Sequence, residues 1–163
     1  EIRNCDWSSD VCSSDLISAV DLWGIVVNPG AASSVGASPA DGKPASPANV
    51  DSGILIAGNV ISDFGEGNEY WNWGGRHDDR GSSYAIAFLA PQLKTNPPLR
   101  DVLVQGNIVY DSSRDVPKSL GGGRPKYRYA VFIEPGEPPP QGLRFVGNIL
   151  HPGASGVSNA PLD

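Results

Sequence analysis

The sequence ILIAGNVI at residues 54–61 returns twice, as VLVQGNIV at residues 102–109 and as LRFVGNIL at residues 143–150. Each copy has apolar side chains at alternate positions, continues with Gly-Asn and ends on two apolar residues. The alternation predicts a short β-strand, and Gly-Asn predicts a tight turn because both residues tolerate a positive φ. Since one such unit cannot bury its apolar face alone, the repeat predicts a solenoid of stacked units.

A second repeat precedes each copy of the first. It reads WGIVVNPG at residues 23–30, YAIAFLAP at residues 84–91 and YAVFIEPG at residues 129–136. Each copy has an aromatic residue, a small residue, an alternating apolar run and a proline. None of these runs has the i, i+3, i+4, i+7 spacing of a helix, and β-branched and aromatic residues dominate. We therefore expect each unit to be strand, turn, strand, Gly-Asn turn, short strand and long loop.

Strand alternation assigns the large apolar residues to an inward face and their neighbours to the outer face. The expected inward pairs are Ile25 and Val27, Ile86 and Phe88, Val131 and Ile133, Ile54 and Ile56, Val102 and Val104, and Leu143 and Phe145. The expected outward residues are Gly24, Val26, Asn28, Ala85, Ala87, Leu89, Ala130, Phe132 and Glu134, with Leu55, Leu103 and Arg144 from the other strands. Equivalent residues should stack at a spacing of about 4.8 Å.

Residues 1–16 share neither repeat, show no strand or helix pattern and contain both cysteines. The stretch 3–16 resembles the conceptual translation of a sequencing-library adapter. We therefore expect residues 1–16 to be non-native and residues 17–163 to form a fragment of a longer solenoid whose true start is missing. The alternative is a genuine polar arm with a disulfide between Cys5 and Cys12. Residues 17–163 contain no cysteine, which excludes a thiol nucleophile or a Cys-ligated zinc there.

The repeated Asn59, Asn107 and Asn148 can form a side-chain amide ladder along the solenoid axis. With these motifs the chain resembles the right-handed parallel β-helix proteins of the pectin-lyase-like superfamily. The resemblance implies an all-β fold, a β-solenoid of about three coils with long loops, and an asparagine ladder between the second and third strands of each coil. It also implies an extracellular or periplasmic protein that acts on a polysaccharide or oligosaccharide.

Two long loops carry the candidate binding residues. Aromatic rings beside charged groups suit a sugar ring, which offers C–H surface for stacking and hydroxyls for hydrogen bonds. The loop from 64 to 83 has this composition, although its tryptophans can instead clamp it onto the solenoid wall. The loop from 112 to 128 adds arginines that can bind a uronate carboxylate. The candidate substrate-binding residues are Tyr70, Trp71, Trp73, Arg76 and Arg128.

Candidate catalytic residues are few, because the outward face of the second repeat is largely apolar. Glu134 lies at its edge, and His77 or Asp79 from the loop can supply a base or a second acid. The resemblance to the superfamily implies a polysaccharide lyase or glycoside hydrolase, although none of its catalytic motifs can be carried over residue by residue. The alternative, which the apolar face favours, is a non-catalytic carbohydrate-binding or structural β-solenoid such as an adhesin. We predict no metal site, although the carboxylates leave Ca²⁺ binding open.

The charge and hydropathy of the chain argue against two classes of partner, nucleic acid and the membrane interior. The formal net charge is −6 and stays negative when residues 1–16 are set aside, which argues against a phosphate-backbone ligand. No apolar run is long enough to span a bilayer. We therefore expect neither nucleic acid nor a membrane span, and the sequence predicts no oligomeric state.

Overall fold

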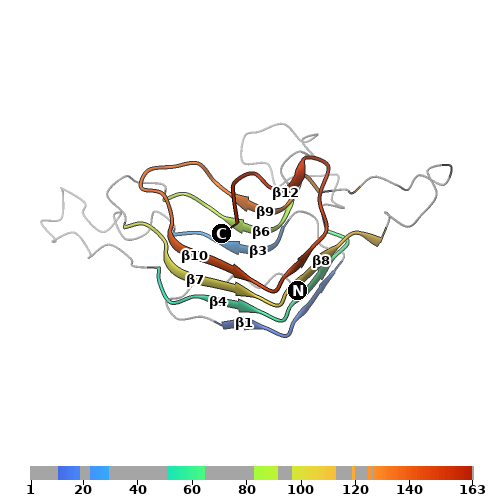
Figure 1. The fold of residues 1–163 in the computed structure, drawn as a ribbon, viewed down its shortest axis with the longest axis horizontal. Coiled ribbons are helices and arrows are strands. Elements are labelled where there is room, and N and C mark those ends of the chain that lie inside the picture. Colours follow the sequence, from blue (N-terminus) through green and yellow to red (C-terminus); the bar gives the residue numbers. More distant parts are fainter. Residues whose placement is uncertain are drawn as a thin grey trace, which may run out of the picture.

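The computed structural model describes residues 11–18, 23–29, 51–64, 83–91, 97–112, 119, 125 and 127–162. These residues form strands, turns and loops, without an α-helix among them. Their twelve strands make three four-stranded sheets in which every paired strand is parallel (Figure 1). The prediction of an all-β fold is therefore confirmed.

Each sheet collects the equivalent strands of successive repeats. The first sheet contains β1 (Val11–Ser13), β4 (Leu55–Ala57), β7 (Arg100–Gln105) and β10 (Gln141–Val146). The second sheet contains β2 (Leu16–Ser18), β5 (Val60–Ser62), β8 (Ile108–Tyr110) and β11 (Ile149–Leu150). The third sheet contains β3 (Trp23–Val27), β6 (Tyr84–Phe88), β9 (Tyr129–Ile133) and β12 (Gly156–Ser158).

Parallel strands need a crossover connection, and here the other two sheets supply it. Along the chain a strand of the first sheet is followed by one of the second and then one of the third. The register keeps equivalent residues together, for example Ile56 beside Val104 and Ile86 beside Val131. Figure 1 shows the resulting stacks, with β10, β7, β4 and β1 in order. This arrangement is compatible with a parallel β-helix.

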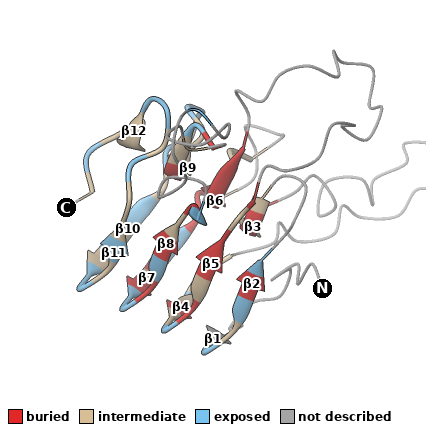
Figure 2. Ribbon diagram, turned by 90° about the vertical axis from the view of Figure 1, so that its right-hand side faces the viewer, coloured by how far each residue is buried: buried red, intermediate tan, exposed pale blue. Residues whose placement is uncertain are grey.

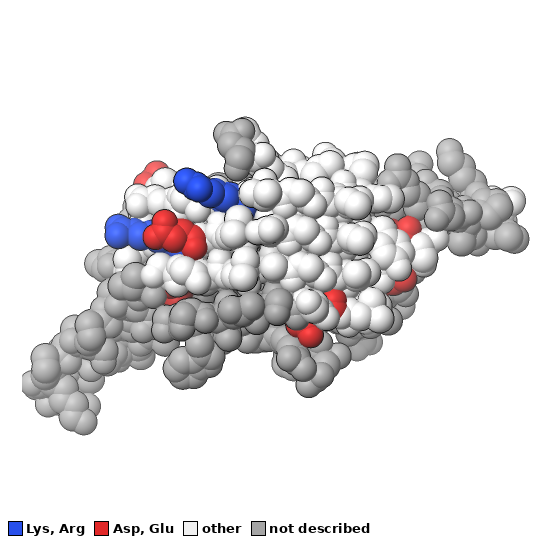
Figure 3. Space-filling model, turned by 60° about the horizontal axis from the view of Figure 1, so that its bottom comes forward, with Lys and Arg blue, Asp and Glu red and all other residues white. Residues whose placement is uncertain are grey.

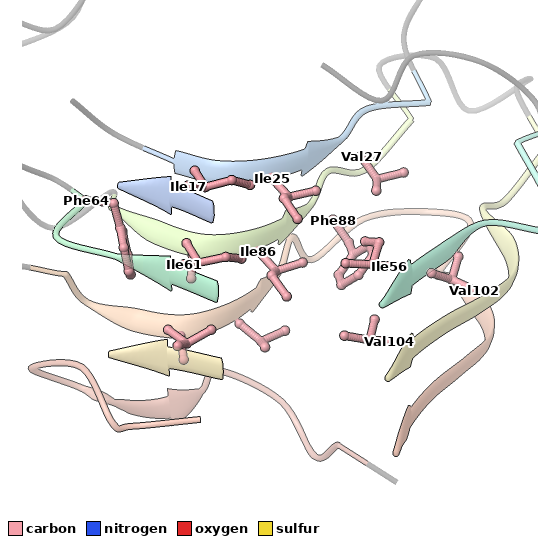
Figure 4. Close-up of a cluster of buried hydrophobic side chains, with 14 of the residues drawn as sticks. Ile17, Ile25, Val27, Ile56, Ile61, Phe64, Ile86, Phe88, Val102 and Val104 are labelled. Carbon is pink, nitrogen blue, oxygen red and sulfur yellow. The ribbon is translucent and has the colours of Figure 1, made fainter. Parts of the chain in front are cut away.

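The interior between the sheets is filled by the predicted inward columns (Figure 4). Ile56, Ile86, Phe88 and Val104 have no exposed surface. The equivalent side chains of the last repeat are only partly buried and pack against this core; they are Ile133, Leu143 and Phe145. Burial is therefore greatest in the central strands and falls toward β2 at one end and β10 at the other, as Figure 2 shows.

One position in each strand of the third sheet departs from the predicted alternation. Ala85 and Ala130 are fully buried and belong to the core, and a Cβ on Gly24 would lie 2.5 Å from Cγ2 of the core residue Ile61. The prediction that these three positions face outward is therefore wrong. Each is followed by another inward residue, so two successive residues face the core where the chain enters the third sheet. The preceding aromatic residues then lie on the outer side; they are Trp23, Tyr84 and Tyr129.

The N-terminal segment also differs from expectation, because β1 and the first residue of β2 lie within residues 1–16. Strand β1 pairs with β4, and Ser14-Asp15 takes the place of Gly58-Asn59 in the stack. Ser14 even adopts the left-handed conformation of that glycine, with φ of 59° against 66°. The absence of a strand pattern was therefore a wrong guide to structure here. The non-native origin of residues 1–16 stays a prediction, and Cys5 lies outside the described residues.

Candidate functional site

The repeated asparagines are occupied in holding the fold together. The backbone N–H and Nδ2 of Asn59 both donate to Oδ1 of Asn107, at 3.0 and 2.9 Å. The same groups of Asn107 donate to Oδ1 of Asn148, both at 2.9 Å. Asn59 and Asn107 are fully buried. This hydrogen-bonded ladder lies between the first and second sheets, and burial keeps the amides of Asn59 and Asn107 from a ligand.

An aromatic cluster marks the outer side of the third sheet. The rings of Tyr84 and Phe132 stack with centroids 4.1 Å apart and planes 7° apart, and Tyr129 lies beside Tyr84 at 6.4 Å. The exposed Arg128 places its guanidinium carbon 5.5 Å from the centroid of the Tyr129 ring. Tyr84 is buried, whereas Tyr129 and Phe132 are partly exposed. We call these four residues the aromatic face.

A small buried residue is the register neighbour of Phe132. Ala87 is next to Phe132 in the register and is fully buried, although it is not part of the core between the sheets. The outer side of this sheet therefore carries a packed aromatic cluster in which Tyr129 and Phe132 are partly exposed.

Glu134, the predicted catalytic acid, lies at the end of β9 and is half-buried. Its Oε2 accepts the backbone N–H of Ala90 at 2.8 Å, and its own N–H donates to the carbonyl of Phe88 at 2.9 Å. This carboxylate therefore joins two neighbouring repeats. Within the described ranges, no group of three His, Cys, Asp or Glu side chains could hold a metal ion.

The predicted loop residues cannot be placed relative to Glu134. Tyr70, Trp71, Trp73, Arg76, His77 and Asp79 all lie outside the described residues. Of the predicted substrate-binding residues, only Arg128 is described, and it belongs to the aromatic face. The roles assigned to the loop residues, and the question of Ca²⁺, stay predictions.

The described residues that flank the two long loops nevertheless lie close together in space. Phe64 ends the described segment before one loop, Tyr127 follows the other, and their rings stack with centroids 4.4 Å apart. Both rings are buried, and the Tyr127 hydroxyl donates to the carbonyl of His151 at 2.8 Å. Asp63 adds a link to Ser112, whose N–H and hydroxyl donate to its Oδ1 at 2.8 and 2.7 Å. Both loops therefore start from the same corner, next to the third sheet.

The outer side of the first and second sheets has a different character (Figure 3). Lys and Arg side chains lie toward one end of this face together with acidic ones, further acidic side chains lie at its lower edge and opposite end, and the area between them is formed by other residues. Four apolar residues stack there in register as an outer column; they are Leu16, Val60, Ile108 and Ile149. No aromatic stack of the described residues lies on this side, so the aromatic face is the better candidate for a ligand site.

Sequence reasoning missed Tyr84, Tyr129 and Phe132 as candidate binding residues. The signal was present, because an aromatic residue opens every copy of the second repeat. Strict alternation obscured it, because it would place Tyr84 on the same side as the inward residue Ile86. The two successive inward residues reverse that assignment.

Comparison with known proteins assigns the chain to no family. The chain matches no protein-family model, and no curated protein or solved structure is similar to it. In the described part of the chain, we find no helix of the length and hydrophobicity that crossing a membrane requires.

Proposed function

We propose that the chain is part of a right-handed parallel β-helix protein of the pectin-lyase-like class that binds an extracellular polysaccharide on its third sheet. Three parallel sheets, strands that return to a sheet only after passing through the other two, and the asparagine ladder support this fold. Fold alone does not establish activity. The functional part of the proposal therefore rests on the surface of the third sheet.

The observation that carries the proposal is the aromatic face. Tyr129 and Phe132 offer partly exposed ring surface, held in place by the stack with Tyr84. Sugar rings pack their C–H surfaces against such rings, and a neighbouring guanidinium donates hydrogen bonds to hydroxyl or carboxylate oxygens. Arg128 is next to Tyr129 in sequence and in space. The arrangement suits a saccharide lying along the sheet.

The described residues support binding more than catalysis. Glycoside hydrolysis uses two carboxylates at a defined separation, and Glu134, the candidate acid among the described residues, already accepts a backbone N–H. A lyase or glycoside hydrolase is the second candidate function. It is favoured by the two long loops that start beside the third sheet, because His77 and Asp79 lie in one of them. In that case Glu134 needs a partner from this loop.

Affinity electrophoresis against a panel of acidic and neutral polysaccharides, with and without Ca²⁺, tests the proposal. We expect retardation by at least one polymer and about tenfold weaker binding for Tyr129→Ala, since lost stacking of about 1.4 kcal/mol corresponds to that factor. Arg144→Ala is the matched control for Arg128→Ala, because Arg144 is an exposed arginine in β10 of the first sheet. Binding that is unchanged in both Tyr129→Ala and Arg128→Ala would refute the proposed site.

Product analysis separates the two candidate functions. An enzyme releases new reducing ends or unsaturated sugars from the polymer that it binds, and Glu134→Gln or Asp79→Asn should then abolish release while leaving retardation intact. A binding protein retards the polymer without shortening it.

A further inference from the structure

The partly exposed rings of the aromatic face belong to a single strand. Tyr129 and Phe132 both lie in β9, three residues apart, which puts their Cα atoms about 10 Å apart along the strand. Tyr84 belongs to the neighbouring strand β6, is only 6% exposed, and has the Phe132 ring stacked against its own at 4.1 Å. The ring surface that a ligand can reach on these two strands therefore follows β9.

The row of residues that crosses the strands at Tyr129 is interrupted on both sides. In register this row contains Trp23, Tyr84, Tyr129 and Gly156, from β3, β6, β9 and β12, which Figure 1 shows in this order. Trp23 is partly exposed, but the buried Tyr84 separates it from Tyr129. On the other side Gly156 offers no side chain. A saccharide that crossed the strands would therefore lose ring contact at each neighbour of Tyr129.

Opposite charges lie at the two ends of β9. Arg128 is exposed, immediately precedes the strand, and places its guanidinium carbon 5.5 Å from the centroid of the Tyr129 ring. Glu134 follows the last residue of the strand, Ile133, which packs against the core, so alternation turns Glu134 to the outer side. Its Oε2 accepts the N–H of Ala90, and a carboxylate can accept further hydrogen bonds.

These two charges favour different sugars on the two rings. A guanidinium pairs with a carboxylate, so Arg128 favours an acidic sugar on Tyr129. Glu134 follows Phe132 by two residues, about 7 Å along the strand. Its charge repels a second carboxylate and its oxygens accept from hydroxyl groups, which favours a neutral sugar on Phe132.

We propose that the bound saccharide lies along β9, with an acidic sugar on Tyr129 and the neutral sugar linked to it on Phe132. This inference rests on the proposed function and names its substrate class. The ligand is a polysaccharide whose disaccharide repeat alternates an acidic and a neutral sugar. One repeat occupies the two rings, and the rest of the polymer leaves the sheet at both ends of β9 instead of following the stack of strands.

The charge pattern of the polymer tests the substrate class. Affinity electrophoresis of the full chain compares hyaluronan and unsulfated chondroitin, which alternate glucuronate with a neutral amino sugar, with polygalacturonate, which has a carboxylate on every unit, and with neutral dextran. At least one alternating polymer should bind about tenfold more tightly than the other two classes. Retardation only by neutral or uniformly acidic polymers overturns this inference and leaves the proposed function standing. Retardation by no polymer refutes the proposed function as well.

Two substitutions test the roles of the charges. Arg128→Ala should weaken binding of the alternating polymer about tenfold, through loss of hydrogen bonds to a charged group, whereas the exposed Arg144→Ala is the matched control. Glu134→Gln keeps an acceptor for the Ala90 N–H but removes the negative charge. It should therefore raise the affinity for polygalacturonate several-fold relative to that for the alternating polymer. An unchanged ratio of the two affinities contradicts the assignment of a neutral sugar to Phe132.

The length of the ligand tests its direction. NMR titration with glucuronic acid and with oligosaccharides of one to four repeats of the alternating polymer gives the affinity per repeat. This affinity should rise from the single sugar to one repeat and then stay level, because β9 contacts one repeat. Phe132→Leu keeps an apolar side chain against Tyr84 but removes the ring, and should abolish the gain from the second sugar. An affinity per repeat that keeps rising with length, or a gain unaffected by Phe132→Leu, overturns the proposed orientation.

Discussion

Replacing Asn107 with alanine removes four side-chain hydrogen bonds from the centre of the ladder. Its Oδ1 accepts the backbone N–H and Nδ2 of Asn59, and its Nδ2 donates to Oδ1 of Asn148 and to the carbonyl of Ile56. The amide thereby uses its full capacity of two accepted and two donated bonds. Alanine can fill neither role.

The expected loss follows from the groups that remain. Two donors of Asn59, which has no exposed surface, lose their acceptor, and the carbonyl of Ile56 loses one donor. Each buried group left without a partner costs about 1–3 kcal/mol, partly offset where water enters. We expect the free energy of unfolding to fall by about 3–5 kcal/mol. This is a large share of the roughly 5–15 kcal/mol typical of a domain.

Urea unfolding followed by circular dichroism measures this loss. With an m-value of about 2 kcal/mol/M, a loss of about 4 kcal/mol lowers the midpoint by about 2 M. Gln105→Ala is the matched control, because Gln105 is an exposed residue of β7 two positions earlier, and it should change stability by less than about 0.5 kcal/mol. A loss below about 1 kcal/mol for Asn107→Ala would refute the reasoning that the ladder stabilises the stack.

Substitutions at three further positions test other contacts by the same unfolding measurement. Gly24→Ala should destabilise by about 1–3 kcal/mol, because the new Cβ would lie 2.5 Å from Cγ2 of Ile61; an unchanged midpoint would place Gly24 outward after all. Ser14→Gly should stabilise by about 0.5–1 kcal/mol, since φ is 59° there, and destabilisation would contradict the assigned backbone. Glu134→Ala should cost about 1 kcal/mol by leaving the Ala90 N–H without its acceptor, whereas Glu134→Gln keeps an acceptor and should cost less; equal losses would argue against that hydrogen bond.

The strand pattern of this chain could be predicted from local sequence because each of the two repeats occurs three times with the same alternation. Alternation correctly assigned Ile56, Ile86 and Val104 to the core, and the Gly-Asn pairs marked the turns. These features depend on period-2 geometry and on residues that tolerate a positive φ, which are properties of the chain segment itself. The strand alternation and the turns are therefore expected in any stacked arrangement that buries the same side of each strand.

The candidate site was less predictable because it depends on corners and on partners from other repeats. Two successive inward residues at the entry to the third sheet moved Ala85 into the core and Tyr84 to the outer side. The carboxylate of Glu134 binds an N–H 44 residues away in the chain. Neither feature can be predicted from a short stretch of sequence, because each depends on residues of another repeat.

The sequence by itself determined the repeating strand order, the core columns and the positions of the ladder asparagines, since side-chain period and turn chemistry are local. Only the tertiary structure decided which face carries the aromatic rings, that the carboxylate of Glu134 joins two repeats, and that Ser14-Asp15 continues a ladder whose sequence it does not share. The physical reason is that backbone pairing between stacked strands depends little on side chains. A segment without the motif can occupy its place, and a residue's surroundings are set by the repeats above and below it.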